Sequence, residues 1–119
     1  MLLGIEDADQ LAYHRMRGHL FENLIVMELL KRRLNAGKES NLFFYRDSNQ
    51  NEIDIVVDDS SSVSLIEVKS SMTYSSSFTK ALDKADKWFN KPISRKSIVY
   101  AGSLEDPDGR IRLINYQHL

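Results

Sequence analysis

Cysteine is absent from the 119-residue chain, which excludes disulfide bonds, thiolate zinc sites and cysteine nucleophiles. Proline and glycine are scarce, at two and five residues, and no Pro/Gly-rich linker divides the chain. The formal net charge is only −1, so any contact with nucleic acid must depend on a local basic patch. There is no signal peptide and no apolar run long enough to span a membrane, so we expect a cytoplasmic protein without a membrane partner.

What remains is an ordinary globular composition, with 42% hydrophobic and 28% charged residues. A chain of this length is sufficient for one domain with a single core. It opens on Met-Leu-Leu-Gly-Ile, without a helix cap or a polar lead-in. We therefore interpret residues 1–119 as a single domain cut from a longer protein, and the sequence does not indicate an oligomeric state.

Residues 10–35 have the apolar spacing of a long helix. Two apolar stripes run along it, so we expect a helix that is apolar around most of its circumference and central to the fold. Gly37 is suited to cap its C-terminus. The two stripes are Leu20, Leu24, Met27, Leu30 and Leu34, and Phe21, Ile25 and Leu29.

The rest of the chain predicts a sheet and one more helix. Strands are expected where aromatic and β-branched residues lie between polar turns, at residues 42–45, 52–58, 63–69, 97–101 and 111–114. A second helix, residues 77–90, carries an apolar face that includes Trp88 and Phe89, which we expect in the core. The predicted fold class is therefore α/β, with the order α-β-β-β-α-β-β and helices flanking a mixed sheet.

Two neighbouring strands carry charge where a core strand is normally apolar. Residues two apart on a strand share a face, so Glu67 and Lys69 point the same way. If residues 59–62 form a four-residue loop, Asp54 lies directly opposite Glu67, with side-chain roots about 5 Å apart. Two facing carboxylates repel each other, and a divalent cation between them explains the pair better than a purely structural role does.

These residue types match the needs of phosphodiester hydrolysis, a reaction that is extremely slow without a catalyst. Divalent metals polarise the phosphoryl oxygen and lower the pKa of a bound water, and Mg²⁺ prefers a few carboxylates plus waters. Asp54 and Glu67 fit as ligands, and Lys69 would orient the attacking water or neutralise phosphate charge. The alternative is a salt bridge on an exposed sheet face, which adds little stability. Glu52 is expected to pair with Lys69.

Glu22 is a fourth candidate, because it lies in a largely apolar zone of the first helix and a buried carboxylate needs a partner. Two partners remain open: an arginine (Arg15, Arg33 or Arg46), or the same metal. The histidines do not have the spacing of a ligand pair, so we assign structural or solvent-facing positions to all three: His14, His19 and His118.

The second helix carries a stripe of lysines at positions i, i+4, i+7 and i+11. Residues 76–96 contain six basic residues against two aspartates, a local net charge of +4. This stripe is the best candidate for nucleic-acid phosphate contacts. The alternative is a solvated helix face that is partly neutralised by the aspartates. The stripe consists of Lys80, Lys84, Lys87 and Lys91.

The order of these motifs resembles the PD-(D/E)XK nuclease superfamily, most closely its Holliday-junction-resolvase-like branch. The corresponding elements are Gly18-His-Leu-Phe-Glu22 on a helix, Asp54 on a strand and Glu67-Val-Lys69 on the next strand. More narrowly, the chain is similar over roughly residues 1–101 to a domain of unknown function that ends many bacterial and archaeal AAA-type ATPases. The segments that carry this similarity are Arg17-Gly-His-Leu-Phe-Glu-Asn23, Phe44-Tyr-Arg-Asp47, Glu52-Ile-Asp54 and Ile66-Glu-Val-Lys-Ser70.

The resemblance implies a restriction-endonuclease-like core, Mg²⁺ bound by Glu22, Asp54 and Glu67, catalysis assisted by Lys69, DNA as the substrate, and an ATPase module upstream. The chain lacks a Gly-x-x-x-x-Gly-Lys-Ser/Thr loop, so this fragment should not hydrolyse ATP. One departure is Ile53, which stands where the superfamily signature has proline. The competing hypothesis is a non-catalytic domain that binds DNA or protein and regulates the ATPase. A third is an interaction domain whose charges form only salt bridges.

Overall fold

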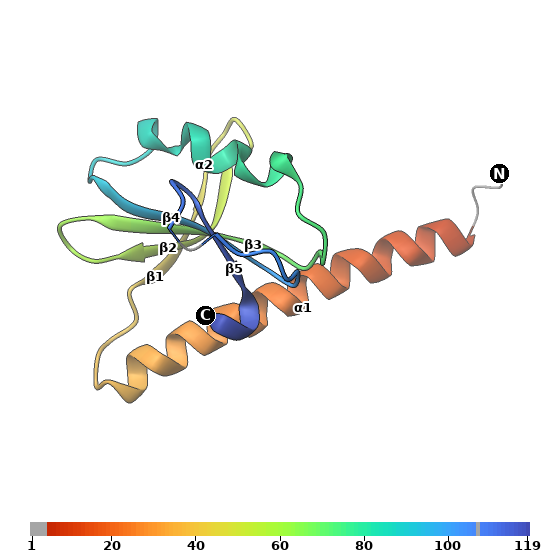
Figure 1. The fold of residues 1–119 in the computed structure, drawn as a ribbon, viewed down its shortest axis with the longest axis horizontal. Helices are drawn as coiled ribbons and strands as arrows, with labels where there is room; N and C mark the ends of the chain where they lie inside the picture. The colour runs from red at the N-terminus through yellow and green to blue at the C-terminus, as the bar shows by residue number, and fades with distance from the viewer. Residues whose placement is uncertain (1–4, 107) are drawn as a thin grey trace.

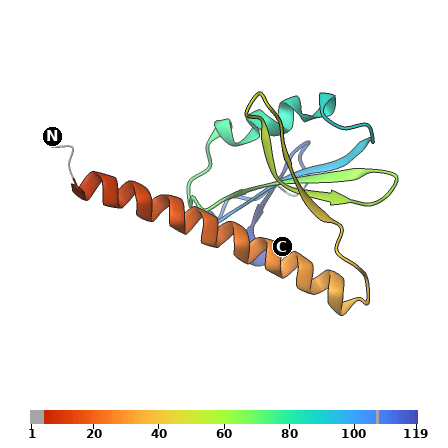
Figure 2. The ribbon, with the colours of Figure 1, turned by 180° about the vertical axis from the view of Figure 1, so that it is seen from behind.

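The computed structural model describes residues 5–106 and 108–119, with side chains described from residue 9 onward. Residues 1–4, which contributed to the interpretation of a cut chain, lie outside the described residues. The two helices lie on opposite sides of a five-stranded sheet, α2 over one face and α1 across the other (Figures 1 and 2). The elements in chain order are α1 (Ile5–Asn35), β1 (Leu42–Arg46), β2 (Glu52–Asp58), β3 (Val63–Lys69), η1 (Ser76–Thr79), α2 (Lys80–Lys84), η2 (Ala85–Lys87), β4 (Ile93–Tyr100), β5 (Arg112–Asn115) and η3 (Tyr116–His118).

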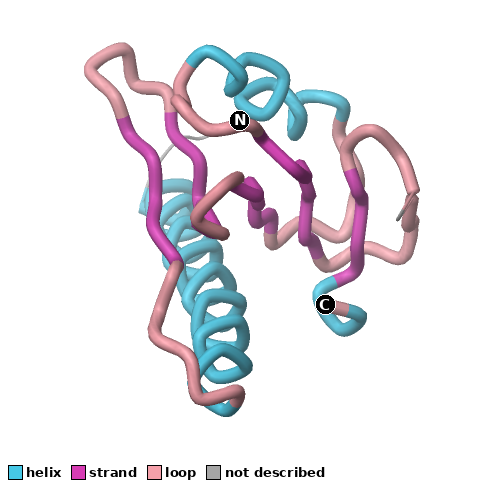
Figure 3. The backbone as a smooth tube through the Cα atoms, turned by 90° about the vertical axis from the view of Figure 1, so that its left-hand side faces the viewer, coloured by secondary structure: helices cyan, strands magenta, loops and turns pink. Residues whose placement is uncertain are grey.

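The strands follow one another across the sheet in the order β1-β2-β3-β4-β5. Strands β1, β2 and β3 pair antiparallel as a meander, whereas β4 and β5 join in parallel. The segment containing α2 connects β3 to β4 above the sheet (Figure 3). The predicted α/β class and element order are confirmed. Two of the predicted strand ranges, 52–58 and 63–69, match β2 and β3 residue for residue.

Helix α1 ends as the sequence predicts. Gly37 adopts a φ of 75°, which costs glycine little because it has no Cβ. The N–H of Gly37 donates to the carbonyl of Leu34 at 2.9 Å, and that of Lys38 donates to Arg33 at 3.1 Å. This pair of bonds is the Schellman motif, which satisfies carbonyls that the helix end leaves free.

The helix is apolar around most of its circumference, but the expectation that it is central to the fold is wrong. Only one stripe packs on the sheet: Ile25 is buried, and Phe21 and Leu29 are partly buried beside it. Four of the five residues of the opposite stripe are 54–63% exposed and the fifth, Leu30, is partly buried, because the sheet presents α1 with a single surface to cover. The N-terminal half of α1 also projects beyond the sheet (Figure 1). The exposed stripe consists of Leu20, Leu24, Met27 and Leu34. Among the described helices, none combines the length and apolar character needed to cross a membrane.

The second predicted helix, residues 77–90, is present only in part. Its α-helical portion is the five-residue α2, flanked by the 3₁₀ helices η1 and η2. Leu82 and Ala85 are fully buried, with Trp88 and Phe89 packed against the same cluster, so the predicted apolar face is confirmed. The 3₁₀ turns change the angular spacing, since they contain about three residues per turn rather than 3.6. Side chains beyond Lys84 therefore do not continue the helical stripe.

The core has two parts, one on each face of the sheet. On the α2 side the buried cluster includes Ile53, Leu65 and Ile98. On the α1 side it includes Ile55 and Ile66. A regular strand would send residues 53 and 55 to the same face. Strand β2 instead sends them to opposite faces, and this irregularity occurs at Asp54.

Candidate active site

The predicted register between β2 and β3 is correct. Ile55 pairs with Ile66 and Asp58 with Val63, and residues 59–62 form the connecting loop. In this register Asp54 and Glu67 are the next opposing positions. Here the hydrogen bonds between the two strands are accepted by side-chain carboxylates instead of backbone carbonyls. The N–H of Asp54 donates to Oε1 of Glu67 at 3.1 Å, and the N–H of Val68 donates to Oδ2 of Asp54 at 2.8 Å. The two carboxylates are therefore fixed by backbone donors at the point where the regular ladder ends.

A β-bulge in β2 explains where Asp54 points. Phe43 pairs with Val56 and Tyr45 with Ile53, so Phe44 alone opposes two residues, Asp54 and Ile55. A bulge bends the strand and re-aims the side chains at the extra residue. As a result Asp54 lines two pockets, one on each side of the bulge. The bulge was not predictable from sequence, because the Glu52–Asp58 segment contains no glycine to mark it.

The two pockets have different chemistry. The pocket toward α1, of about 370 Å³, is lined by aromatic and polar side chains that include His19, Glu22, Phe44 and Arg46. The pocket toward α2, of about 330 Å³, contains Glu67 with three lysines: Lys69, Lys80 and Lys84. Asp54 and Glu52 line both. The structure thus brings Asp54, Glu67 and Lys69 together in one pocket and places Glu22 in the other.

The buried carboxylate of Glu67 is the most perturbed group of the site. The residue is only 6% exposed. The pKa of Glu67 is raised to about 7, and burial is the largest cause. The charges of Asp54 and Glu22 contribute to the rise, whereas the Asp54 N–H and Lys69 oppose it. A carboxylate held in this way favours either a proton or a nearby cation.

The pKa values of Asp54 and Glu22 are also raised. Burial raises the pKa of Asp54, although the Val68 N–H and Lys69 oppose the shift. Burial also raises the pKa of Glu22, and the charge of Asp54 adds to this effect. Among the described ion pairs none involves Glu22, so the arginine partner offered as an alternative is not seen at salt-bridge distance. The three carboxylates therefore interact electrostatically across the bulge.

Lys69 is the cation nearest to Glu67. Its Nζ lies 3.8 Å from Oε2 of Glu67 and 5.6 Å from the ring centre of Phe78. The prediction that Glu52 pairs with Lys69 is wrong. Oε1 of Glu52 lies 3.1 Å from Nε of Arg46, the direct cross-strand partner of Glu52 in β1. The antiparallel β1–β2 pairing puts these opposite charges side by side, and Lys69 remains with the carboxylates.

The lysine stripe is divided between two places. Lys80 and Lys84, at the two ends of α2, line the pocket of Glu67. Lys91 instead lies 2.8 Å from Asp58, at the far end of β2. Lys87 and Lys91 are not among the described residues that line either of these two pockets. The predicted stripe of four therefore contributes two lysines to the site, because the helix gives way to a 3₁₀ turn after Lys84.

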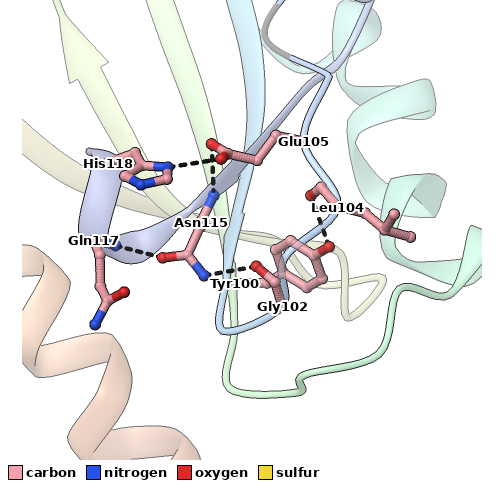
Figure 4. Close-up of polar contacts among 7 residues, drawn as sticks. All are labelled: Tyr100, Gly102, Leu104, Glu105, Asn115, Gln117 and His118. Atoms are coloured by element: carbon pink, nitrogen blue, oxygen red, sulfur yellow. Dashed lines mark hydrogen bonds and ion pairs between the residues drawn. The ribbon is translucent and has the colours of Figure 1, made fainter.

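His19, Phe44 and Arg46 line the pocket on the α1 side, although none of the three was predicted as a site residue. The signal for His19 was its position three residues before Glu22, which places both on one helix face. His118 does have a structural position, as expected. Its Nδ1 lies 2.6 Å from Oε1 of Glu105, in a polar cluster at the end of β5 (Figure 4).

The donor chemistry of the site fits a hard divalent cation. Mg²⁺ is commonly held by one or two carboxylates and several waters. Asp54 and Glu67 supply two carboxylates, each with one oxygen engaged by a backbone N–H. Within the described residues, acidic and histidine side chains do not gather into a group of three that could enclose a metal. The assignment of Glu22, Asp54 and Glu67 as a complete ligand set thus stays a prediction, with Asp54 and Glu67 as its better-placed pair.

Comparison with known proteins places the chain in a family. No curated protein and no solved structure matches it. A family model described as "Domain of unknown function (DUF4143)" matches residues 17–119, which include all the elements that line the two pockets. The match covers most of the chain and contains Glu22, Asp54, Glu67 and Lys69. The chain therefore belongs to the DUF4143 family of domains of unknown function.

Proposed function

We propose that this domain is a PD-(D/E)XK-like nuclease domain of an AAA-type ATPase and cleaves DNA phosphodiester bonds with Mg²⁺. One observation carries the proposal: Asp54, Glu67 and Lys69 line a single pocket together with two further lysines. Acid residues that raise one another's pKa in a cleft are typical of functional sites. Lysines beside them suit a substrate that carries phosphate.

The sheet supports the same proposal. Asp54 and the Glu67-Val-Lys69 motif lie on adjacent antiparallel strands, β2 and β3. Glu22 lies on α1, which covers the opposite face of the sheet, and its electrostatic interaction with Asp54 connects it to the pair. This is the element order that the resemblance to the nuclease superfamily implies. The restriction-endonuclease-like core and the ATPase context are part of the proposal.

In this proposal the side chains of the site have different roles. Asp54 and Glu67 would hold Mg²⁺, with Glu22 as a further carboxylate on the α1 side. Bound there, the metal would supply Lewis-acid polarisation of the phosphoryl oxygen and a more acidic water. Lys69, 3.8 Å from Glu67, would orient the attacking water and stabilise negative charge on the phosphate. Lys80 and Lys84 would bind the flanking phosphates.

A plasmid-nicking assay tests the proposal. The chain is incubated with supercoiled DNA and Mg²⁺ or Mn²⁺, beside Asp54→Asn and Lys69→Ala. We expect nicked or linear product from the unaltered chain and a loss of at least about 100-fold in both variants, typical for removal of one group that stabilises the transition state. Asp58→Asn is a matched control, because Asp58 lies on the same strand but pairs with Lys91 away from the pocket. Equal cleavage by all four proteins would refute the assignment.

A second candidate function is a regulatory domain without catalysis, which binds its ATPase partner through protein contacts. The exposed apolar stripe of α1 favours it, because soluble proteins rarely leave large contiguous apolar surface uncovered. In this hypothesis Leu24→Asp with Met27→Asp would weaken binding of the separately produced ATPase module, whereas Asp54→Asn would not. Binding that is unchanged by the double variant would exclude the stripe as the contact surface.

A further inference from the structure

Phe44 is an exposed aromatic side chain at the edge of the candidate active site. We propose that Phe44, backed by the guanidinium of Arg46, is a stacking platform for an unpaired nucleobase next to the phosphate at Asp54. The substrate would then be single-stranded or locally unpaired DNA. This inference deepens the proposed function and rests on it, because it names the substrate class for the same site.

The side chain of Phe44 is exposed to solvent rather than packed in the core. The residue is 72% exposed on β1, the edge strand of the sheet. Its neighbour Tyr45 is used in the core, where its ring lies parallel to that of Trp88 at 5.1 Å. Leu42 packs on the α1 side of the sheet, so Phe44, two residues along, faces the same side. A large aromatic ring therefore stands in solvent on the face that carries Glu22.

Arg46 gives this ring a cationic neighbour. Its guanidinium carbon lies 5.7 Å from the ring centre of Phe44, and its Nε lies 3.1 Å from Glu52. Glu52 thus holds the guanidinium beside the ring. An aromatic face next to an arginine is the combination by which proteins bind single-stranded nucleic acid, through base stacking and cation–π contacts.

The bulge in β2 connects the platform to the chemistry. Because Phe44 opposes Asp54 and Ile55, the ring is the cross-strand neighbour of the candidate metal ligand. Phe44, Arg46 and Asp54 line one pocket, while Asp54 also lines the other pocket with Lys80 and Lys84. A nucleotide bound across Asp54 would have its phosphate on the lysine side and its base on the Phe44 side.

A site that binds the base on one side of Asp54 and the phosphate on the other disfavours the binding of an intact duplex. A base within a duplex is paired and stacked, so its face is not available to Phe44. Moving it out of the stack has an unstacking cost that an unpaired base does not carry. Single strands, flaps and frayed ends would therefore bind more tightly than fully paired DNA of the same length.

The test is equilibrium binding by fluorescence anisotropy in EDTA, so that no cleavage occurs. The ligands are a labelled thymine oligonucleotide and a blunt duplex of equal length. Phe44→Leu keeps an apolar side chain but removes the ring, and we expect it to bind the single strand about 5- to 150-fold more weakly, with the duplex little changed. Phe44→Trp should restore or strengthen single-strand binding. Leu104→Ala alters another exposed apolar residue, away from both pockets, and should leave binding unchanged.

Two outcomes would overturn the inference: a single-strand affinity that Phe44→Leu does not change, or an equal loss for single strand and duplex. Because the readout does not require cleavage, the two proposals can fail separately. A chain that binds single strands through Phe44 but never nicks DNA would refute only the nuclease. Cleavage that requires Asp54 without any dependence on Phe44 would refute only the stacking platform.

Discussion

Asp54 and Glu67 are joined by a hydrogen bond from a backbone N–H to a carboxylate where the β2–β3 ladder stops. Oε1 of Glu67 accepts from the N–H of Asp54, and Oδ2 of Asp54 accepts from the N–H of Val68. Each carboxylate thus accepts a hydrogen bond from a backbone N–H at the end of the ladder. The arrangement fixes two acids beside each other at an electrostatic cost, which a proton or a bound cation would relieve.

This cost predicts a dependence of stability on pH. The pKa of Glu67 in the folded chain is about 7, above its ordinary value of 4.5. Between these values the folded state holds a proton that the unfolded state has lost, so the free energy of unfolding falls as pH rises through this window. We expect a loss on the order of 2–3 kcal/mol between pH 4.5 and 7.5, measured by urea denaturation in EDTA. Glu67→Gln should flatten the dependence, and equal slopes for both proteins would contradict it.

A divalent cation should offset this loss. At pH 8 the carboxylate of Glu67 is mostly charged, because its pKa is about 7. A cation that binds only the folded state stabilises it by about 2.7 kcal/mol at one hundred times its dissociation constant. We expect millimolar Mn²⁺ or Mg²⁺ to raise the melting temperature at pH 8 and to have little effect at pH 5. Asp54→Asn and Glu67→Gln should lose the shift, whereas Glu105→Gln, beside His118, should keep it. A shift retained in all variants would place the cation elsewhere.

The sequence was most informative where local pattern and turn length act together. Strands β2 and β3 are rich in β-branched residues, and the four-residue loop between them sets the register, so the Asp54–Glu67 pair was predictable. The bulge was not, because it depends on how β1 pairs with β2 over several residues. The burial of α1 was overestimated, since apolar periodicity shows where a helix has apolar faces but not how many of them the fold covers.

The lysines of α2 show a similar limit. Helical periodicity predicted four lysines along one side of a continuous helix. In the structure the helix changes to a 3₁₀ turn at Ala85, where Leu82, Ala85 and Trp88 pack in the core. Only Lys80 and Lys84 reach the pocket of Glu67. Propensity and spacing describe an isolated helix, whereas the geometry of a short, sheet-packed segment depends on contacts far along the chain.

The divided stripe predicts unequal roles in DNA binding. Lys80→Ala with Lys84→Ala should weaken binding and reduce the slope of log K against log salt by about one for each phosphate that the two lysines neutralise. Lys87→Ala with Lys91→Ala removes the same charge outside the pocket and should have a smaller effect. Anisotropy titrations at several salt concentrations measure both. Equal effects of the two pairs would mean that the lysines act only through net charge.

Two glycines should respond to alanine in opposite directions. A Cβ at Gly102 would overlap the carbonyl oxygen of Met72 and the ring of Tyr100. That ring is held by a 2.7 Å bond from its hydroxyl to the carbonyl of Leu104, and Asn115 donates to the Gly102 carbonyl at 2.6 Å (Figure 4). The overlap cannot be relieved without disturbing these bonds, so we expect Gly102→Ala to cost about 1–3 kcal/mol.

Gly18 is the comparison residue, because a side chain at this position would have free space around it. It lies within α1, where a Cβ would meet nothing within 4 Å among the described residues. Alanine loses less backbone freedom than glycine when a helix forms, so Gly18→Ala should stabilise the chain by about 0.5–1 kcal/mol. Urea denaturation of both variants under one condition measures the difference. If Gly102→Ala were as stable as the unaltered chain, residues 100–104 would have to rearrange without a cost in stability. Such an outcome would contradict the prediction that the overlap with Met72 and Tyr100 destabilises the fold.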